Sequence, residues 1–256
     1  MKRLSSQRRH RLEEGRFVVE GPKMINEALA AGVTPEVVYV DSAGARAEIW
    51  GLSERCEAAG SEVLVLQPGV LARACDSVTP QPVAAVVANL DRPLADLRDA
   101  RPGLIVVGVG LQDPGNAGAL VRSAAASGAA GVIFAAGCVD VYNPKAVRAT
   151  AGTLFKVRLS IGEPALAIAE ELRRWGLELF ATVPRGGRPC WEVDLTCPSA
   201  VMVGGEAGGL PSEVQRAVPG RVTIPMSAGV ESLNVAMAAT VICFEAARQR
   251  SATNRA

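Results

Sequence analysis

Short apolar runs alternate with longer amphipathic stretches along this chain of 256 residues. A run of about four to eight apolar residues is typical of a buried strand, and apolar residues spaced by three or four positions indicate a helix. In the front third, the runs predict strands at 17–19, 37–40, 63–66 and 83–88, and the spacing predicts helices at 24–31, 45–59 and 71–76. The chain therefore begins with a compact α/β unit of about 75 residues, close to the small end of independent domains.

A second α/β unit follows a charged segment that contains two prolines, a composition typical of a linker. The pattern beyond it predicts strands at 104–107, 131–134, 177–182, 200–203 and 221–224, and helices at 117–127, 144–151, 164–175, 212–218 and 233–248. Strands that alternate with helices predict a parallel sheet covered on both faces. The predicted organisation is a basic arm at 1–16, a small domain at 17–90, a linker at 91–103, a larger domain at 104–250 and a tail at 251–256.

Composition limits the kind of core and the class of partner. Hydrophobic residues make up 49% of the chain and aromatic residues only 4%, so the core must consist mostly of Ala, Val and Leu. A net charge of +1 gives no sign of a globally basic protein, but the first 16 residues contain six Lys or Arg and only two Glu. This start is either a solvated terminal helix or an arm that contacts phosphates, and the charges alone leave both open.

Cysteine and histidine usage argues against a metal site. The six cysteines include no CxxC pair, and the chain has a single histidine, so we predict free thiols in a reducing compartment and no bound metal. The basic start lacks the apolar run of a signal peptide, and no stretch has the length needed to span a bilayer. We therefore expect a cytoplasmic protein that makes no use of a membrane.

Two glycine-rich stretches near the end of the chain predict a ligand site. Residues 201–211 read VMVGGEAGGLP, and residues 222–240 read VTIPMSAGVESLNVAMAAT. Glycine allows backbone to approach a ligand because it has no Cβ. Both stretches include or follow a predicted strand, and parallel sheets hold their ligands beyond the carboxyl ends of the strands.

A third candidate stretch follows the strand at 104–107. Asp113-Pro114-Gly115 is a turn signal, and Asn116 is a favourable N-cap for the next helix. Arg122 lies six residues farther along, so a strict helix would place the Asn116 and Arg122 side chains on different faces. A capping Asn and a surface Arg remain the alternative to a shared ligand. The sequence patterns of a dinucleotide site, a P-loop and a Ser/His/Asp hydrolase are all missing.

These stretches together resemble a known enzyme family. DPGNAGALVRSAAASGA, MVGGEAGGLP and IPMSAGVESLNVAMAATVICFE resemble, in order and internal spacing, the three motifs of the SpoU (TrmH-like) RNA 2′-O-ribose methyltransferases of the SPOUT superfamily. YNPKAVRATAGTLFKV is similar to the segment between the first two motifs. RFVVEGPKMINEALAAG and VTPQPVAAVV are similar to the family's small RNA-binding domain. The resemblance covers nearly the whole chain.

The resemblance implies a fold and a cofactor. In this family a small α/β/α RNA-binding domain, here 17–90, precedes a parallel-sheet α/β domain whose last segment forms a deep trefoil knot. S-adenosyl-L-methionine lies in the knot, held largely by backbone and without a metal. On matching positions, the implied cofactor contacts are Gly204, Gly205, Ile224, Pro225, Met226, Leu233 and, at a separate strand end, Thr182.

The resemblance also implies a set of catalytic residues. A ribose 2′-hydroxyl is almost fully protonated at neutral pH, so it needs a base or an electrostatic activator. Arg122 matches the family's arginine at this hydroxyl, and because a guanidinium stays charged, we expect it to stabilise the developing alkoxide rather than to act as the base. Asn116 and Glu206 would fix Arg122, while Ser232 and Asn234 match the family's polar pair near cofactor and RNA phosphate.

RNA binding and a dimer are implied as well. Much of the affinity for RNA comes from phosphates, and the basic candidates near the arm and the first motif are Arg8, Arg9, Arg11, Lys145 and Arg148. The family works as a homodimer whose interface includes the long last helix and completes the site. Small residues of that helix would permit close approach of its partner helix, namely Ala236, Ala238 and Ala239.

We therefore predict a homodimeric, S-adenosyl-L-methionine-dependent RNA 2′-O-methyltransferase. The separate front domain favours ribosomal RNA, by analogy with relatives that carry such a domain. A tRNA ribose methyltransferase and an antibiotic-resistance rRNA methyltransferase remain alternatives within the enzyme class. A catalytically silent RNA-binding protein is the alternative from another class, and the intact polar set of the three motifs argues against it.

Overall fold

The structure, a computed structural model, describes residues 1–75, 79–98 and 103–253 and contains two compact units. The front unit comprises Met1–Leu90 and Asp140–Lys156, and the back unit comprises Asp91–Val139 and Val157–Ala256. Three predicted features extend outside the described residues: the end of the helix expected at 71–76, part of the linker, and the last residues of the tail. The α/β fold class is confirmed, with a separate sheet in each unit.

The front unit is built on a four-stranded sheet in the order β1-β4-β2-β3. These strands are β1 (Arg16–Glu20), β4 (Val83–Ala88), β2 (Val37–Asp41) and β3 (Glu62–Leu66). β4 pairs antiparallel with β1 and β2, and β3 pairs parallel with β2. The four predicted strands are confirmed: β1, β4 and β2 are apolar runs with buried residues. The edge strand β3 is apolar as well, but it has no buried residue, and Leu64 and Val65 are 37% and 55% exposed.

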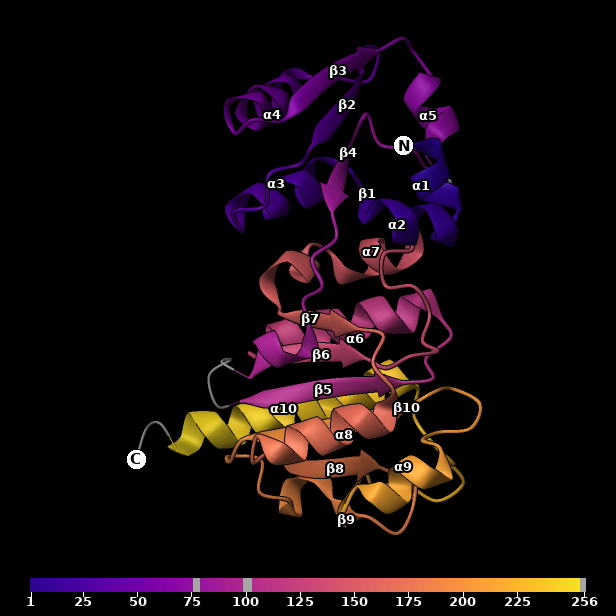
Figure 1. The fold of residues 1–256 in the computed structure, drawn as a ribbon, viewed down its shortest axis with the longest axis vertical. Helices are drawn as coiled ribbons and strands as arrows, with labels where there is room; N and C mark the ends of the chain where they lie inside the picture. Colours follow the sequence, from indigo (N-terminus) through magenta and orange to yellow (C-terminus); the bar gives the residue numbers. More distant parts are fainter. Residues whose placement is uncertain (76–78, 99–102, 254–256) are drawn as a thin grey trace. The chain divides into compact units, whose positions relative to one another are not determined.

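Helices lie on both faces of this sheet. Figure 1 shows α3 (Pro22–Ala30) and α4 (Ala47–Ala58) on one side and α1 (Lys2–Ser6), α2 (Arg8–Glu14) and α5 (Val70–Ala74) on the other. The residues expected to form a terminal arm thus fold onto the sheet. They form two helices rather than one, because Gln7 has an extended backbone with φ −127° and ψ 115°. Leu4 is 3% exposed and anchors the first of them.

The segment Asp140–Lys156 belongs to the front unit, although we expected it in the larger domain. It contains α7 (Pro144–Thr150) and the 3₁₀ helix η2 (Thr153–Lys156). Phe17 of β1 accounts for this placement, because its ring packs on Tyr142 and Phe155 with centroids 4.7 and 6.5 Å away. An ion pair of 2.5 Å between Lys156 and Glu27 lies beside these contacts. The predicted start of the larger domain at residue 104 therefore differs from the packing, which places Asp140–Lys156 with the front unit.

The back unit contains a seven-stranded sheet in the order β7-β6-β5-β10-β8-β11-β9, and every neighbouring pair is parallel. Its central strands are β6 (Gly131–Phe134), β5 (Leu104–Val109), β10 (Ser199–Gly204), β8 (Glu178–Thr182) and β11 (Gly220–Thr223). The predicted parallel sheet is confirmed. Two edge strands, β7 (Leu159–Ile161) and β9 (Arg188–Pro189), are absent from the sequence prediction because runs of three and two residues carry no period.

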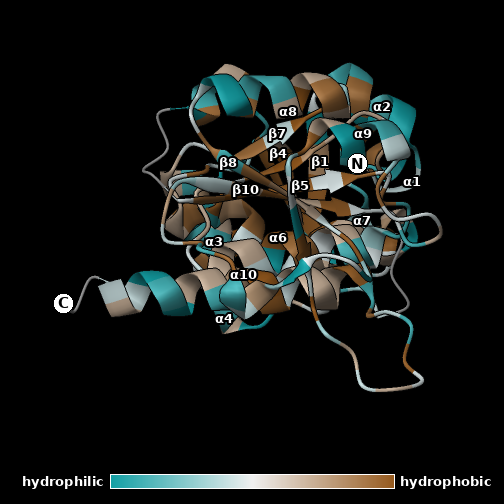
Figure 2. Ribbon diagram, turned by 90° about the horizontal axis from the view of Figure 1, so that it is seen from below, coloured by the Kyte–Doolittle hydropathy of each residue, from teal (hydrophilic) through white to brown (hydrophobic). Residues whose placement is uncertain are grey.

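Helices cover both faces of this sheet as well. Figure 2 shows α8 (Ala165–Arg174) and α9 (Ser212–Ala217) on one side and α6 (Pro114–Ala126) and α10 (Val235–Thr253) on the other. Apolar side chains of α8 and α9 join those of the sheet in one core. Part of the predicted linker also folds: η1 (Leu94–Leu97) buries Leu97, which is 1% exposed, in the same core. A remaining 3₁₀ turn, η3, spans Cys190–Glu192.

Candidate active site

The loops that follow four parallel strands meet at one edge of the back-unit sheet. β5, β10, β8 and β11 are neighbours and run in the same direction, so their carboxyl ends lie together. The loops after β8, β10 and β11, with the start of α10, enclose a cavity of about 620 Å³. This is the position at which open parallel sheets bind ligands, and the volume suits a small-molecule cofactor.

Most residues that the sequence singled out for a cofactor line this cavity. Those at the cavity wall are Thr182, Gly204, Gly205, Ile224, Met226 and Leu233. Glu206, Ser232 and Asn234, expected to be catalytic, line it too. Pro225 lies between two lining residues. Asn116 and Arg122 are not part of the lining. The sequence prediction did not assign the apolar wall at Leu210, Val222, Ala238 and Ile242 to the cofactor site. Leu210 and Val222 lie in or after strands of the site, whereas Ala238 and Ile242 lie within α10 and gave no signal of their own.

Two of the glycines serve backbone packing as well as the cavity. A Cβ on Gly204 would lie 2.0 Å from the carbonyl carbon of Gly209, and a Cβ on Gly205 would lie 2.2 Å from the carbonyl oxygen of Gly110. The Gly209 amide also donates to the Gly205 carbonyl at 2.9 Å. Close approach to a ligand is therefore not the whole reason for these glycines, because the protein's own main chain already occupies the Cβ positions.

The helix that follows β5 begins at a different residue from the one predicted. Asp113 is the N-cap of α6, and its Oδ1 accepts a hydrogen bond from the Asn116 amide at 2.9 Å. Pro114 occupies the first helical position, where its fixed φ and missing N–H are tolerated. The prediction that Asn116 caps this helix is wrong. Its side chain is thereby left to make contacts outside the helix.

A chain of hydrogen bonds joins the three motifs. The Asn234 side-chain amide donates to Asn116 Oδ1 at 2.9 Å, and Asn116 Nδ2 donates to Glu206 Oε1 at 2.7 Å. Asn234 Oδ1 in turn accepts from the Ala236 amide at 2.9 Å at the start of α10. We call Asn234, Asn116 and Glu206 the amide relay. It fixes the orientation of both amides, because each oxygen and each nitrogen has a partner of defined polarity.

Glu206 is the anionic end of the amide relay. Its carboxylate accepts from the backbone amides of Gln112 and Asp113 at 3.1 and 3.2 Å. Desolvation alone would raise the pKa of Glu206, but the hydrogen bond from Asn116 and those from backbone amides outweigh it and hold the pKa below its ordinary value. Glu206 is therefore ionised at neutral pH and holds the loop after β5 to the loop after β10.

Arg122 is exposed on α6 and stands apart from the amide relay. It lies about 9 Å farther along the helix axis than Asn116, at 1.5 Å per residue. Among the described residues, no hydrogen bond or ion pair joins it to Asn116 or Glu206. The expectation that these two residues fix Arg122 is therefore wrong within one chain, because Asn116 and Glu206 bind each other instead.

The final helix uses its small residues inside its own chain. Ala236 and Ala239 are 5% and 1% exposed, and α10 packs on α6 with Ser123 Oγ 2.6 Å from Thr240 Oγ1. The expectation that these alanines form a subunit interface is therefore wrong, and Ala238 lines the cavity. The exposed side of α10 is instead an apolar stripe of Met237, Val241 and Phe244, which are 62%, 41% and 49% exposed.

The basic candidates for RNA contact lie in the front unit and differ in exposure. Arg8, Arg9, Lys145 and Arg148 are exposed. Arg11 is not: its guanidinium is 3% exposed, donates to Asp140 at 2.7 Å and also bonds the Leu4 carbonyl. The prediction that Arg11 contacts RNA is corrected by this burial, since the guanidinium is turned inward and bonds Asp140 and the Leu4 carbonyl.

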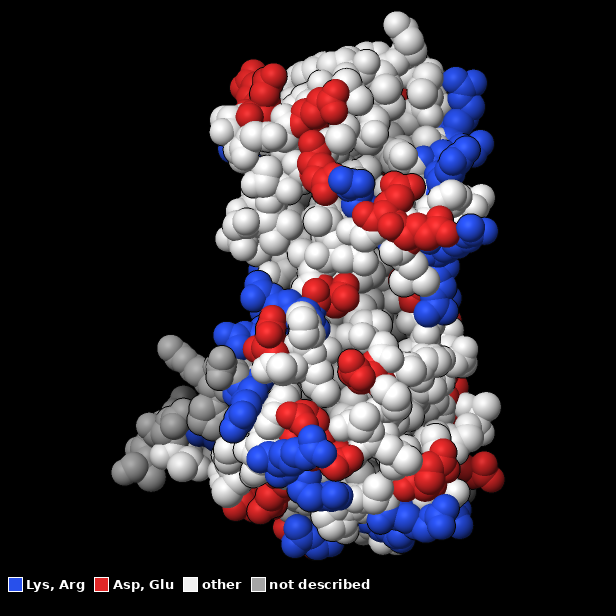
Figure 3. Space-filling view, in the orientation of Figure 1, with Lys and Arg blue, Asp and Glu red and all other residues white. Residues whose placement is uncertain are grey.

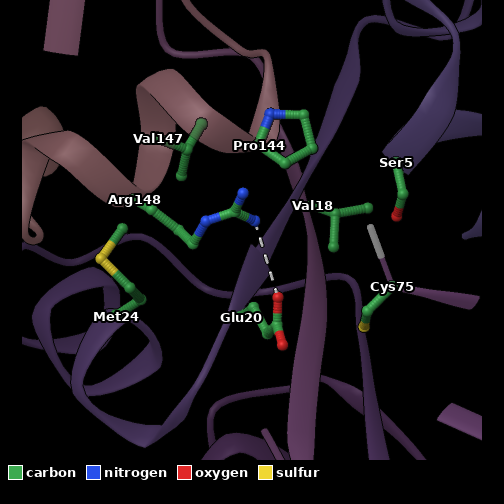
Figure 4. A pocket seen from close by; sticks show the side chains of 8 residues that line it. All are labelled: Ser5, Val18, Glu20, Met24, Cys75, Pro144, Val147 and Arg148. Atoms are coloured by element: carbon green, nitrogen blue, oxygen red, sulfur yellow. Dashed lines mark ion pairs between the residues drawn. The ribbon is translucent and has the colours of Figure 1, made fainter. Parts of the chain in front are cut away.

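Arg148 borders a small cavity that α7 shares with β1 and the end of α5. Figure 4 shows its guanidinium directed at Glu20, 3.8 Å away, with Val18, Cys75 and Pro144 around the same space. The cavity of about 10 Å³ has room for one water molecule. Desolvation raises the pKa of the Cys75 thiol to about 11, with the charge of Glu20 adding to the effect. Cys75 is therefore a protonated, structural thiol.

Two further observations bear on the class of protein. In the part of the chain that the structure describes, no helix is long and apolar enough to cross a membrane. Within the same residues, no group of three or more His, Cys, Asp or Glu side chains is arranged to hold a metal ion.

Comparison with protein families finds two matches along the chain. Residues 103–244 match the SpoU rRNA Methylase family, and residues 1–85 match the MRM3-like substrate binding domain. Together these matches leave only short stretches of the chain uncovered.

Individual relatives are similar over nearly their full length. The 23S rRNA (uridine(2479)-2′-O)-methyltransferase of Streptomyces viridochromogenes is 32% identical over 255 residues, which cover 96% of this chain and 88% of that protein. The 23S rRNA (guanosine(2553)-2′-O)-methyltransferase RlmP of Bacillus subtilis is 26% identical over 238 residues, covering 93% and 90%. The crystal structure of the SpoU methyltransferase AviRb from Streptomyces viridochromogenes in complex with the cofactor AdoMet has a TM-score of 0.89 at 29% identity, covering 98% and 96%.

Proposed function

This chain belongs to the SpoU rRNA Methylase family, and from that premise we propose that it transfers a methyl group from S-adenosyl-L-methionine to a ribose 2′-oxygen of ribosomal RNA. The observation that carries the proposal is the amide relay, which ties one residue of each motif together beside the cavity. If the chain had kept the fold but lost methyl transfer, no selection would maintain Asn234, Asn116 and Glu206 as complementary hydrogen-bond donors and acceptors.

The cavity residues fit the proposed cofactor. The wall combines glycine backbone at Gly204 and Gly205 with apolar side chains at Ile224, Met226 and Leu233, and its volume of about 620 Å³ lies within the range of small-molecule sites. Glu206 adds a negative charge near a ligand whose sulfonium is positive. When bound, S-adenosyl-L-methionine supplies a methyl group that is already electrophilic and whose carrier leaves as a neutral thioether, so no metal is required.

Arg122 is proposed to activate the nucleophile electrostatically. The 2′-hydroxyl must lose its proton as the new O–C bond forms, and a nearby guanidinium stabilises the alkoxide that develops. A guanidinium is a poor base because it stays protonated in proteins. Ser232 and Asn234 are exposed at the mouth of the cavity, where they would orient the RNA phosphate and the cofactor. The proton of the 2′-hydroxyl would then be accepted by water or by an RNA phosphate oxygen.

We propose further that the enzyme is a homodimer in which each subunit completes the site of the other. Support comes from two features of the back unit: the exposed apolar stripe of α10, and an exposed Arg122 that lies outside the cavity of its own chain. Burying the stripe against a second copy would remove an apolar surface from water. The same contact would carry Arg122 of the partner subunit toward a cavity that lacks an arginine in its lining.

Ribosomal RNA is favoured over tRNA as the substrate. The relatives named 23S rRNA methyltransferases cover the front unit as well as the back unit, and residues 1–85 match a substrate binding domain. We also propose the deep trefoil knot of the family for the segment around β11 and the start of α10. Cytoplasmic location completes the proposal, since the ribosomal RNA of a bacterial relative is found there.

Mixed dimers test the shared site. Arg122→Ala removes the activating charge, and Met226→Arg places a bulky cation in the cavity; each homodimer should transfer no methyl group. A heterodimer isolated with two different tags has one intact cavity that faces an intact Arg122, so about half of wild-type transfer should return. A heterodimer as inactive as its parents would show that Arg122 acts within its own chain. Calorimetry on Arg122→Ala should find unchanged affinity for S-adenosyl-L-methionine.

A further inference from the structure

The helices of the front unit divide into two groups of opposite charge. α1, α2, α5 and α7 together contain eight Lys or Arg and two Glu, a net charge of +6. α3 and α4 together contain two Lys or Arg and four Glu, a net charge of −2. Figure 3 shows Lys and Arg along the edge over α1, α2 and α5, with Asp and Glu beside them near α2 and further Asp and Glu over α4. The average charge of the chain hides this separation.

The basic helices form one packed layer. Leu4 of α1 and Leu71 of α5 share a buried cluster with Val18 of β1 and with Ala84 and Val86 of β4. The sheet face under α1 and α5 is therefore the same one. α7 joins this layer at β1, because Pro144 and Val147 line a small cavity together with Ser5 of α1 and Val18.

A buried ion pair holds helices of the basic layer together. Arg11 and Asp140 have side chains that are 3% and 8% exposed, and their atoms lie 2.7 Å apart. Arg11 also donates to the Leu4 carbonyl, so one guanidinium connects α1, α2 and the segment that leads into α7. The charges around it are consequently held on a folded surface and do not belong to a loose arm.

We propose that this basic layer is the surface of the front unit that binds the phosphate backbone of the substrate RNA, and that the α3–α4 side does not contact it. The identity of the polyanion as RNA rests on the proposed function. The layer presents seven exposed cations, namely Lys2, Arg3, Arg8, Arg9, Arg73, Lys145 and Arg148. Lys2 and Arg3 belong to the basic start for which phosphate contact was one alternative, and Arg73 has no role in the sequence prediction. The match to a substrate binding domain includes helices on both faces of the front sheet, so it does not say which face binds RNA. The positive charge assigns this role to the face that carries the basic layer.

The chemistry of the layer also limits how RNA is recognised. α1, α2, α5 and α7 contain no Phe, Tyr or Trp, so the side chains of these helices that could stack on a splayed base are His10 and the guanidinium planes of the arginines. Contacts to phosphates are then expected to dominate, and such contacts release counterions. Binding through this layer should therefore be steeply dependent on salt and nearly independent of base sequence.

Two matched triple variants of the full chain test the assignment. The first, Arg3→Gln, Arg8→Gln and Arg73→Gln, removes three exposed charges from the basic layer. The second, Lys23→Gln, Arg46→Gln and Arg55→Gln, removes three exposed charges from the α3–α4 side and gives the same net charge. The probe is a fluorescein-labelled transcript of Bacillus subtilis 23S rRNA, and affinity is measured by anisotropy between 50 and 200 mM KCl, a range in which about six contacts cost several decades of affinity.

The slope of log affinity against log salt decides the outcome. Each phosphate contact contributes about 0.7–0.9 to that slope, so the first variant should lose about two to three from it and the second should keep the wild-type slope. Equal slopes for the two variants would overturn the assignment, as would a larger loss for the second. If the first triple variant melts early, Arg3→Gln and Arg73→Gln are measured singly, with a loss below one expected for each.

Failure of the proposed function would look different. Transfer of labelled methyl groups to the same transcript is measured in parallel on the wild-type protein. An inactive wild-type protein would count against the proposed reaction, while the comparison of the two slopes would still decide which face binds RNA.

Discussion

Substituting Gly205 by Ala should damage the fold of the back unit before it affects the cofactor. The added Cβ would lie 2.2 Å from the carbonyl oxygen of Gly110 and 2.9 Å from its carbonyl carbon, roughly 1 Å or more inside ordinary contact. Both groups are main chain at the ends of paired strands, so neither can rotate away. Gly205 does not have a positive φ, so the contact alone sets the penalty.

The loss of folding stability can be estimated from the main-chain atoms of Gly110 that the added Cβ meets. Overpacking a close-packed site costs about 1–3 kcal/mol, and a clash of Cβ with main chain belongs at the upper end. A loss of about 3 kcal/mol corresponds to a fall in Tm of about 6–12 °C for a chain of this size. Differential scanning calorimetry of the apoprotein measures it directly, without any ligand.

Gly208→Ala is the matched control, because it lies in the same loop, also lines the cavity and has no atom within 4 Å of its Cβ position. It should melt within about 1–2 °C of the wild-type protein, as a surface substitution of under 0.5 kcal/mol does. A Gly205→Ala protein with an unchanged Tm and a lost affinity for S-adenosyl-L-methionine would refute this reasoning and restore close ligand approach as the reason for the glycine.

Three other perturbations have defined outcomes. Arg11→Met should lower the free energy of unfolding by about 3–5 kcal/mol in urea titrations, because Asp140 stays buried without its cation, and adding Asp140→Asn should recover part of the loss. Asn116→Asp places a second carboxylate beside Glu206, which is ionised because its pKa is lowered. Cofactor affinity of that variant, measured by calorimetry, should be poor at pH 8 and recover toward pH 5 as one proton is shared, whereas Asn116→Ala should show no such recovery. Phe244→Glu puts a charge in the apolar stripe of α10. On the proposal that this stripe joins two copies, the variant should be a monomer in light scattering while the wild-type protein is a dimer.

Most strands of the two sheets could be predicted from the sequence, because a strand buried in a sheet requires a run of apolar residues. The runs at 83–88 and 131–134 coincide with β4 and β6. The edge strands β7 and β9 have only three and two residues, which is too short for a recognisable apolar run. The placement of Asp140–Lys156 could not be predicted either, because it depends on aromatic contacts between Phe17 and residues more than 120 positions away.

The location of the site could be predicted from the sequence, but the contacts between its residues could not. Glycine-rich stretches after strands located the cavity, because parallel strands end together. The partners of Asn116 could not be read from spacing, since they lie 90 and 118 residues away, and the same residue was misassigned as a helix cap that Asp113 provides. Likewise, small residues in α10 indicated close packing but not whether the neighbour is α6 or a second chain.

The atom that receives the methyl group decides whether this protein is an RNA 2′-O-methyltransferase. The purified protein is incubated with S-adenosyl-L-methionine that carries a labelled methyl group and with unmodified 23S rRNA transcript, and the digested nucleosides are analysed by mass spectrometry. We expect label on a ribose 2′-oxygen in the wild-type reaction and none with Arg122→Ala. Label on a base, or equal labelling by the wild-type protein and Arg122→Ala, would contradict this expectation.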